Sequence, residues 1–191
     1  AWFPRFSPSK EGGVTTLTHD NCIPGLFLQC GDASHLIVLF HANAEDIGYA
    51  LPQLQALRKH LRCHVLALEY AGYGLCTGTP GFDTIISDCD SALQFVWKIL
   101  EFPVERTILF GRSIGCCMAI ELALRHPRVG GLVCVGGFTT VQDVVRDWFG
   151  SAAAFVFGGS YVRFFDFKSR LNFLNKMFGF VQSMISILPT K

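Results

Sequence analysis

Short apolar runs recur through the middle of the chain. They occupy residues 36–40, 64–70, 107–110 and 131–135. Continuous apolar runs of this length are typical of strands that are buried on both faces of a sheet. The pattern also predicts a strand at residues 23–30 and an edge strand at residues 14–18.

Segments with helical periodicity separate these runs. Leucines recur on one face after residue 46, residues 83–101 repeat apolar side chains at helical spacing, and residues 113–125 are apolar nearly all round. The last pattern predicts a buried helix. Pro52 is expected near the first turn of its helix, because a proline deeper inside removes a backbone hydrogen bond. Strands that alternate with helices predict an α/β fold, with a mostly parallel sheet and flanking helices.

The chain has 191 residues, which is enough for one domain with a hydrophobic core. We divide it into an N-terminal extension (1–22), a partial α/β core (23–150) and an atypical apolar tail (151–191). In the tail, residues 169–188 are spaced as in an amphipathic helix. Three interpretations of this segment stay open: it covers the edge of the strand at 131–135, lies on a membrane surface, or has no stable fold.

Composition narrows the classes of function. Hydrophobic residues make up 50% of the chain, charged residues 16%, and the net charge is +1, which argues against disorder and against a nucleic-acid surface. The eight cysteines form no C-x-x-C pair, so we interpret them as reduced core residues in a cytoplasmic protein. No metal or cofactor is indicated. The longest uncharged apolar run, residues 148–162, is too short to span a membrane.

A G-x-S-x-G sequence joins the run at 107–110 to the following helix. Gly111, Ser113 and Gly115 occupy its fixed positions. Between a strand and a helix, this pattern predicts a nucleophile elbow, a tight turn that exposes the serine at the end of the sheet. Ser113 is therefore the candidate nucleophile. The alternative is a tight turn with a serine that only caps the helix.

A nucleophilic serine also needs donors that stabilise the negative charge formed in the reaction. In an elbow of this kind, one donor is the backbone N–H of the next residue, here Ile114, and the second comes from the loop after the 36–40 strand. That loop has the sequence His41-Ala42-Asn43-Ala44-Glu45-Asp46. We predict Asn43 as the second donor, with Ala44 as the next candidate; the alternative is an ordinary strand-to-helix connection.

Together these motifs resemble the α/β-hydrolase superfamily, and more closely the α/β-hydrolase domain-containing protein 17 group, membrane-associated serine hydrolases that remove palmitate from proteins. The resemblance covers about residues 23–150 and rests on residues 41–46, 69–80 and 108–115, with further similarity at 132–140 and 165–167. Ala42 stands where the family usually has glycine. The resemblance implies hydrolysis of an ester or thioester, with palmitoylated proteins as candidate substrates and peripheral membrane contact.

The general base of such an enzyme is not recognisable. The triad order in this fold is serine, acid, histidine, and the only histidine after Ser113 is His126, about 20 Å away at the far end of the same helix. The family's last strands, which carry the acid and the histidine, are not recognisable in residues 151–191. Asp143 is a candidate acid and His41 a candidate base in a variant arrangement, although His41 is better explained as a residue that orders its loop.

Three explanations remain open for the missing base. The chain is a truncated or mis-spliced form of a working serine hydrolase and is weakly active or inactive as given, which is the expectation that we prefer. The second explanation is a non-catalytic module that binds lipids or proteins. The third is an enzyme with an unusual general base, or with a general base that a partner supplies.

Overall fold

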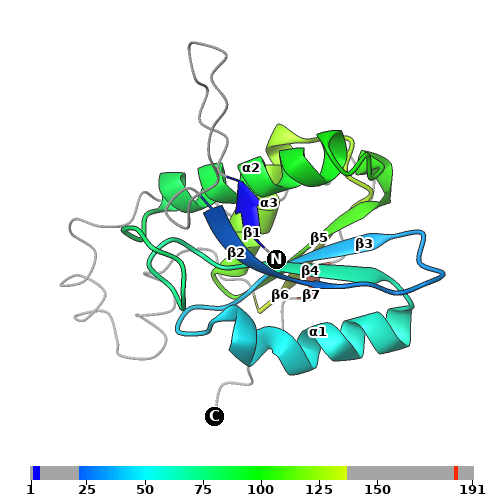
Figure 1. The fold of residues 1–191 in the computed structure, drawn as a ribbon, viewed down its shortest axis with the longest axis horizontal. Coiled ribbons are helices and arrows are strands. Elements are labelled where there is room, and N and C mark those ends of the chain that lie inside the picture. Colours follow the sequence, from blue (N-terminus) through cyan, green and yellow to red (C-terminus); the bar gives the residue numbers. More distant parts are fainter. Residues whose placement is uncertain (1, 5–21, 137–182, 185–191) are drawn as a thin grey trace.

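A mixed sheet runs through the centre of the molecule, with helices on both of its faces (Figure 1). The computed structural model describes residues 2–4, 22–136 and 183–184. Within these residues the strand order is β1-β2-β4-β3-β5-β6-β7. Helices α2 (Phe82–Lys98) and α3 (Gly115–Arg125) cover one face, and α1 (Ile47–Leu61) covers the other.

The predicted parallel sheet is confirmed by its four central strands. These are β4 (His64–Leu68), β3 (Leu36–Phe40), β5 (Thr107–Arg112) and β6 (Gly131–Val135), and all neighbours among them are parallel. Strand β2 (Cys22–Leu28) adds to β4 in the antiparallel sense. Because the central strands run the same way, the loops that follow them all emerge at one edge of the sheet, where ligands bind in such folds.

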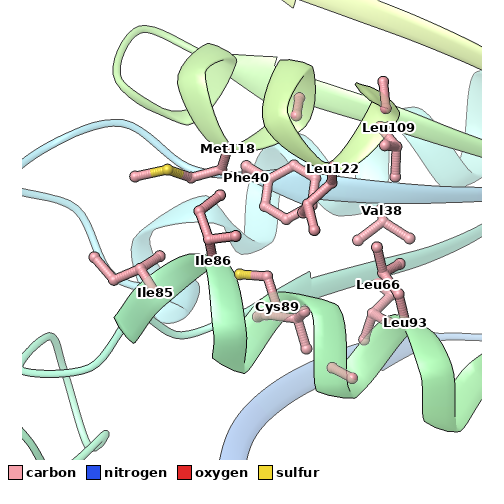
Figure 2. Packing of buried hydrophobic residues seen from close by; sticks show 14 of the residues in the cluster. Val38, Phe40, Leu66, Ile85, Ile86, Cys89, Leu93, Leu109, Met118 and Leu122 are labelled. Atoms are coloured by element: carbon pink, nitrogen blue, oxygen red, sulfur yellow. The ribbon is translucent and has the colours of Figure 1, made fainter. Parts of the chain in front are cut away.

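The apolar runs are strands because both faces of the sheet are covered. In β3, Val38 and Phe40 belong to the larger core cluster, whereas Ile37 and Leu39 belong to a smaller one with Leu54 of α1. Figure 2 shows the larger cluster, in which α2 and α3 pack their apolar side chains against the strands. Alternate residues of one strand thus face opposite layers of the core. Because neither face of the strand meets solvent, the strand needs no alternation with polar residues.

Helix α1 begins earlier than its leucine spacing suggested. The Asp46 side chain accepts a hydrogen bond from the Tyr49 N–H at 2.7 Å and caps the helix, which starts at Ile47. Pro52 is the sixth helical residue, so it lies in the second turn and deeper in the helix than the expected position near the first turn. The residue four positions earlier, whose carbonyl loses its helical partner, is Gly48.

Both outer edges of the described sheet use residues from outside the central segment. Strand β1 (Trp2–Pro4) pairs with β2, and its Phe3 is buried against Phe95 of α2, so part of the predicted N-terminal extension belongs to the core. Strand β7 (Ser183–Met184) pairs with β6. The helix expected over 169–188 is wrong at these two residues, which instead cover part of the β6 edge. The edge strand expected at 14–18 and the expectation about the family's last strands lie outside the described residues.

None of the helices in the described residues combines the length and the apolar character needed to cross a bilayer.

Two leucines of α1 offer a test of this packing, because they lie seven residues apart on the same helix. Leu54 is 0% exposed and Leu61 is 58% exposed. We expect Leu54→Ala to lower the free energy of unfolding by about 2–5 kcal/mol, because it leaves a cavity under α1. Leu61→Ala should change it by less than about 0.5 kcal/mol. Urea unfolding measures both, and equal losses would contradict the described packing.

Candidate active site

Ser113 lies in a sharp turn between β5 and α3. Its backbone has a φ of +53°, a left-handed conformation that residues other than glycine rarely adopt. The Ser113 N–H donates to the Val135 carbonyl at 2.9 Å, and the Ser113 carbonyl accepts from the Cys116 N–H at 3.0 Å. Helix α3 starts at Gly115, two residues later than the sequence suggested, because Ser113 itself is not helical. This geometry is that of a strand–turn–helix elbow.

The two glycines of the motif are required by space. A Cβ on Gly115 would overlap the Phe40 carbonyl oxygen and lie 2.8 Å from the His41 carbonyl oxygen. A Cβ on Gly111 would lie 2.5 Å from the Cys116 Cα. Both contacts are with backbone, which cannot move aside as a side chain can. The glycines thus let α3 approach β3 and β5 closely.

The loop with the predicted second donor begins beside the elbow. Phe40, the last residue of β3, pairs with Gly111 of β5, so residues 41–46 and the elbow leave the sheet at the same level. Asn43 is exposed, and Ala44 has a φ of +59°. Among the described residues, no hydrogen bond engages the backbone N–H of Asn43, Ala44 or Ile114. These N–H groups are thus free to bind an external acceptor, and their role as an oxyanion hole stays a prediction.

His41, the first residue of this loop, is buried, and both of its ring nitrogens have partners. Nδ1 lies 3.0 Å from the Ala42 carbonyl oxygen, and Nε2 lies 3.1 Å from Oε1 of Glu69. The ring stacks on Tyr70 with a centroid separation of 4.0 Å. No ring nitrogen remains to accept a proton from Ser113. The geometry thus agrees with a histidine that orders its loop rather than with the candidate base.

Glu69 and Tyr70 are site residues whose contacts the sequence did not reveal. Glu69 Oε2 accepts from the Ile47 N–H at 3.1 Å, and the Tyr70 hydroxyl donates to the His41 carbonyl at 2.9 Å. Complete burial raises the pKa of Tyr70 well above its usual range, so its hydroxyl remains a donor at neutral pH. A carboxylate at the end of an apolar strand was the available signal, because a buried charge requires partners.

Arg112, the variable residue before the serine, also has a partner in the loop. Its guanidinium forms an ion pair with Glu45 through Nη2 and Oε1. The other oxygen of Glu45 accepts from the Ala42 N–H at 3.3 Å. Sequence spacing could not indicate this pair, because its members are far apart in the chain and belong to different motifs.

The remaining histidines of the described residues lie away from the elbow. His126 follows the last residue of α3 and pairs with Asp90 of α2, and the 11-residue helix puts it about 16 Å from the turn. His35 precedes β3, His64 begins β4 and His60 lies in the last turn of α1, so these three lie toward the opposite edge of the sheet. Asp143, the candidate acid, lies outside the described residues.

The cysteines confirm the expectation that they are core residues. All eight are free thiols, and all except the partly exposed Cys30 are buried. Burial raises the pKa of Cys117 to about 12, so this thiol stays protonated and inert at neutral pH. Within the described residues, no group of three or more histidine, cysteine or acidic side chains is arranged to hold a metal ion.

Comparison with known proteins identifies the family. A family model described as serine aminopeptidase, S33, matches residues 31–165. The chain belongs to this α/β-hydrolase family. The match includes the loop at 41–46, the elbow and the central parallel strands.

Curated relatives extend this result. The chain is 38% identical over 94 residues to the α/β-hydrolase domain-containing protein aho-3 of Caenorhabditis elegans, a match that covers 49% of this chain and 28% of the relative. It is 32% identical over 108 residues to the human α/β-hydrolase domain-containing protein 17C, covering 56% of this chain and 33% of the relative. The matched segment thus spans about a third of the length of these relatives.

A solved structure shows the same fold. The esterase LipW from Mycobacterium marinum superposes with a TM-score of 0.58 at 16% identity, covering 83% of this chain and 65% of that structure. At this identity the likeness establishes the fold alone.

The close approach at Gly115 is testable with two glycine variants. We expect Gly115→Ala to lower the free energy of unfolding by about 3 kcal/mol or more, because the added Cβ meets backbone atoms of β3 and its loop. Gly31→Ala is the matched control, since nothing lies within 4 Å of its added Cβ. Thermal unfolding of both variants measures the difference. A Gly115→Ala protein as stable as the control would contradict the described elbow.

Proposed function

We propose that this domain hydrolyses an ester or a thioester, with Ser113 as the nucleophile. The observation that carries the proposal is the left-handed backbone of Ser113 at the turn between β5 and α3, next to a loop whose Asn43 and Ala44 N–H groups have no partner among the described residues. A strained residue at the active edge of an α/β sheet indicates function, because strain of about 1–3 kcal/mol is retained only where the surroundings impose it.

In this mechanism the Ser113 hydroxyl oxygen attacks the substrate carbonyl carbon while a general base removes its proton. The carbonyl oxygen becomes negatively charged and accepts hydrogen bonds from the N–H groups of Ile114 and Asn43, with Ala44 as the alternative donor. The N-terminal end of α3 adds a favourable dipole. The leaving alcohol or thiol takes the proton, and a water molecule then releases the acyl group from Ser113. One such donor contributes about 10²–10³-fold in rate.

The general base comes from outside the described residues in this proposal. Within them, His41 is occupied by Glu69 and Ala42, and His126 is paired with Asp90. The same observation favours a second candidate function, a non-catalytic module that binds acyl chains or a protein partner. Labelling of Ser113 separates the two, because a serine without a base is a poor nucleophile.

An acylated substrate is supported by two exposed side chains on segments that follow the parallel strands. Tyr49 in the first turn of α1 and Leu75 in the loop after β4 are large apolar side chains that are mostly exposed at this edge of the sheet. We include protein depalmitoylation, a cytoplasmic location and peripheral membrane contact in the proposal. Eight free thiols support a reducing compartment. A net charge of +1 gives no support for a nucleic-acid partner.

A fluorophosphonate probe tests the nucleophile directly. We expect the folded chain to be labelled at Ser113 and Ser113→Ala to lose all labelling. Ser34→Ala is the control, because Ser34 precedes β3 at the opposite edge of the sheet; it should be labelled like the unmodified chain. Intact-mass and peptide mass spectrometry give the readout. A folded chain that stays unlabelled would support the non-catalytic module instead.

The substrate class is tested by comparing the hydrolysis rates of reagents that differ in the bond to be cleaved. The matched family is described as an aminopeptidase and LipW is an esterase, so both bond types need a reagent. We expect p-nitrophenyl acyl esters and acyl thioesters to be hydrolysed at least about 10-fold faster than amino-acid p-nitroanilides, because the loop carboxylates that could bind a free amine already have partners, Glu45 in Arg112 and Asp46 in the Tyr49 N–H. Faster release from the anilides would contradict the ester proposal. The rate measured with Ser113→Ala is the background and is subtracted from each rate.

A further inference from the structure

The ion pair between Arg112 and Glu45 joins the elbow directly to the loop after β3. Arg112 is the last residue of β5, and Glu45 lies in the loop at 41–46. Arg112 also donates through Nη1 to Oε1 of Gln53 in α1, at 3.3 Å. The second oxygen of Glu45 accepts from the Ala42 N–H. One carboxylate thus connects the loop backbone to a side chain of the elbow.

The surroundings of this pair differ from those of a surface ion pair. The Glu45 side chain is 10% exposed and that of Arg112 is 36% exposed, so water screens their interaction only in part. By contrast, the Arg128–Glu105 pair has side-chain exposures of 75% and 55%. Exposed pairs of that kind contribute little to structure. Loss of Arg112 would leave the Glu45 carboxylate largely buried without its cation.

The pair makes contacts within two residues of both predicted oxyanion donors. Arg112 is two residues before Ile114, and Ala42 is one residue before Asn43. The elbow and the loop each contribute one of the two donors, so the distance between the donors depends on how firmly these segments are held together. Catalysis by such donors requires positions fixed before the reaction starts.

Other contacts hold the ends of the loop, and one exposed hydrogen bond reaches its middle. Phe40 pairs with Gly111 at the start, and Glu69 holds His41 and the Ile47 N–H at the two ends. The Tyr73 hydroxyl donates to the Asn43 side chain at 2.6 Å, in an exposed position. Within the described residues, Glu45 is the charged group that links the middle of the loop to the elbow.

We infer that Arg112 is a positioning residue, which acts through Glu45 to set the separation of the Asn43 and Ile114 N–H groups. Its effect on the reaction rests on the proposed function, whereas its effect on the loop does not. Arg112 thus contributes to the rate without touching the substrate.

Two measurements on the full chain test this inference. The first is hydrogen exchange of peptides that cover residues 41–47 in Arg112→Gln and Glu45→Gln. We expect exchange at least about threefold faster there, with peptides of α2 unchanged, because the loop loses its link to the elbow. Arg128→Gln is the matched control and should leave residues 41–47 unchanged.

The second measurement is the rate constant for fluorophosphonate labelling of Ser113. We expect a fall of about 10-fold in Arg112→Gln, because small displacements of donors reduce rates strongly. Arg112→Lys should recover part of the rate, and Arg112→Gln with Glu45→Gln should be no slower than Arg112→Gln alone. If Arg112 only stabilised the fold, a variant of unchanged stability would not show a slower labelling rate that lysine at this position partly restores.

The outcomes separate the inference from the proposed function. If the unmodified chain is not labelled, the proposed function fails, and faster exchange of residues 41–47 in both variants still supports the link between loop and elbow. If exchange there matches the unmodified chain in both variants, the inference is overturned. Faster exchange with an unchanged labelling rate overturns the positioning role. Should Arg112→Gln not fold, Glu45→Gln provides the same comparison.

Discussion

The close contact between α3 and the end of β3 is the constraint on which the site depends. Because residue 115 has no side chain, the helix begins against the Phe40 carbonyl, and the turn before it places Ser113 at the edge of the sheet. The same contact brings the start of α3 next to the loop at 41–46. A larger residue here would separate the nucleophile from its predicted donors and open the core beneath them.

The loop itself is held mainly by groups that belong to other strands. Glu69 follows β4 and Arg112 ends β5, and each supplies the loop at 41–46 with a charged partner. Three neighbouring strands thus determine one loop. Buried charges with several hydrogen bonds are costly to rearrange, so such a loop keeps its shape without a bound ligand.

Much of this fold could be predicted from the chain because its signals are local. The strands at 36–40 and 131–135 are recognisable from apolar runs, and the elbow from two glycines around a serine. The partners of His41 and Arg112 could not be predicted, since they depend on which strands lie side by side. The place of Pro52 within α1 could not be predicted from the leucine spacing, because the Asp46 cap sets the start of the helix.

The backbone of Ser113 has a consequence for how this protein could change over generations. A φ of +53° suits glycine better than serine, so the substitution that would relax the turn most also removes the hydroxyl group. Selection for folding stability alone would therefore remove the Ser113 hydroxyl group. A serine that persists at this position indicates that something other than folding stability retains it, and its replacement by glycine in a lineage would mark the loss of that requirement.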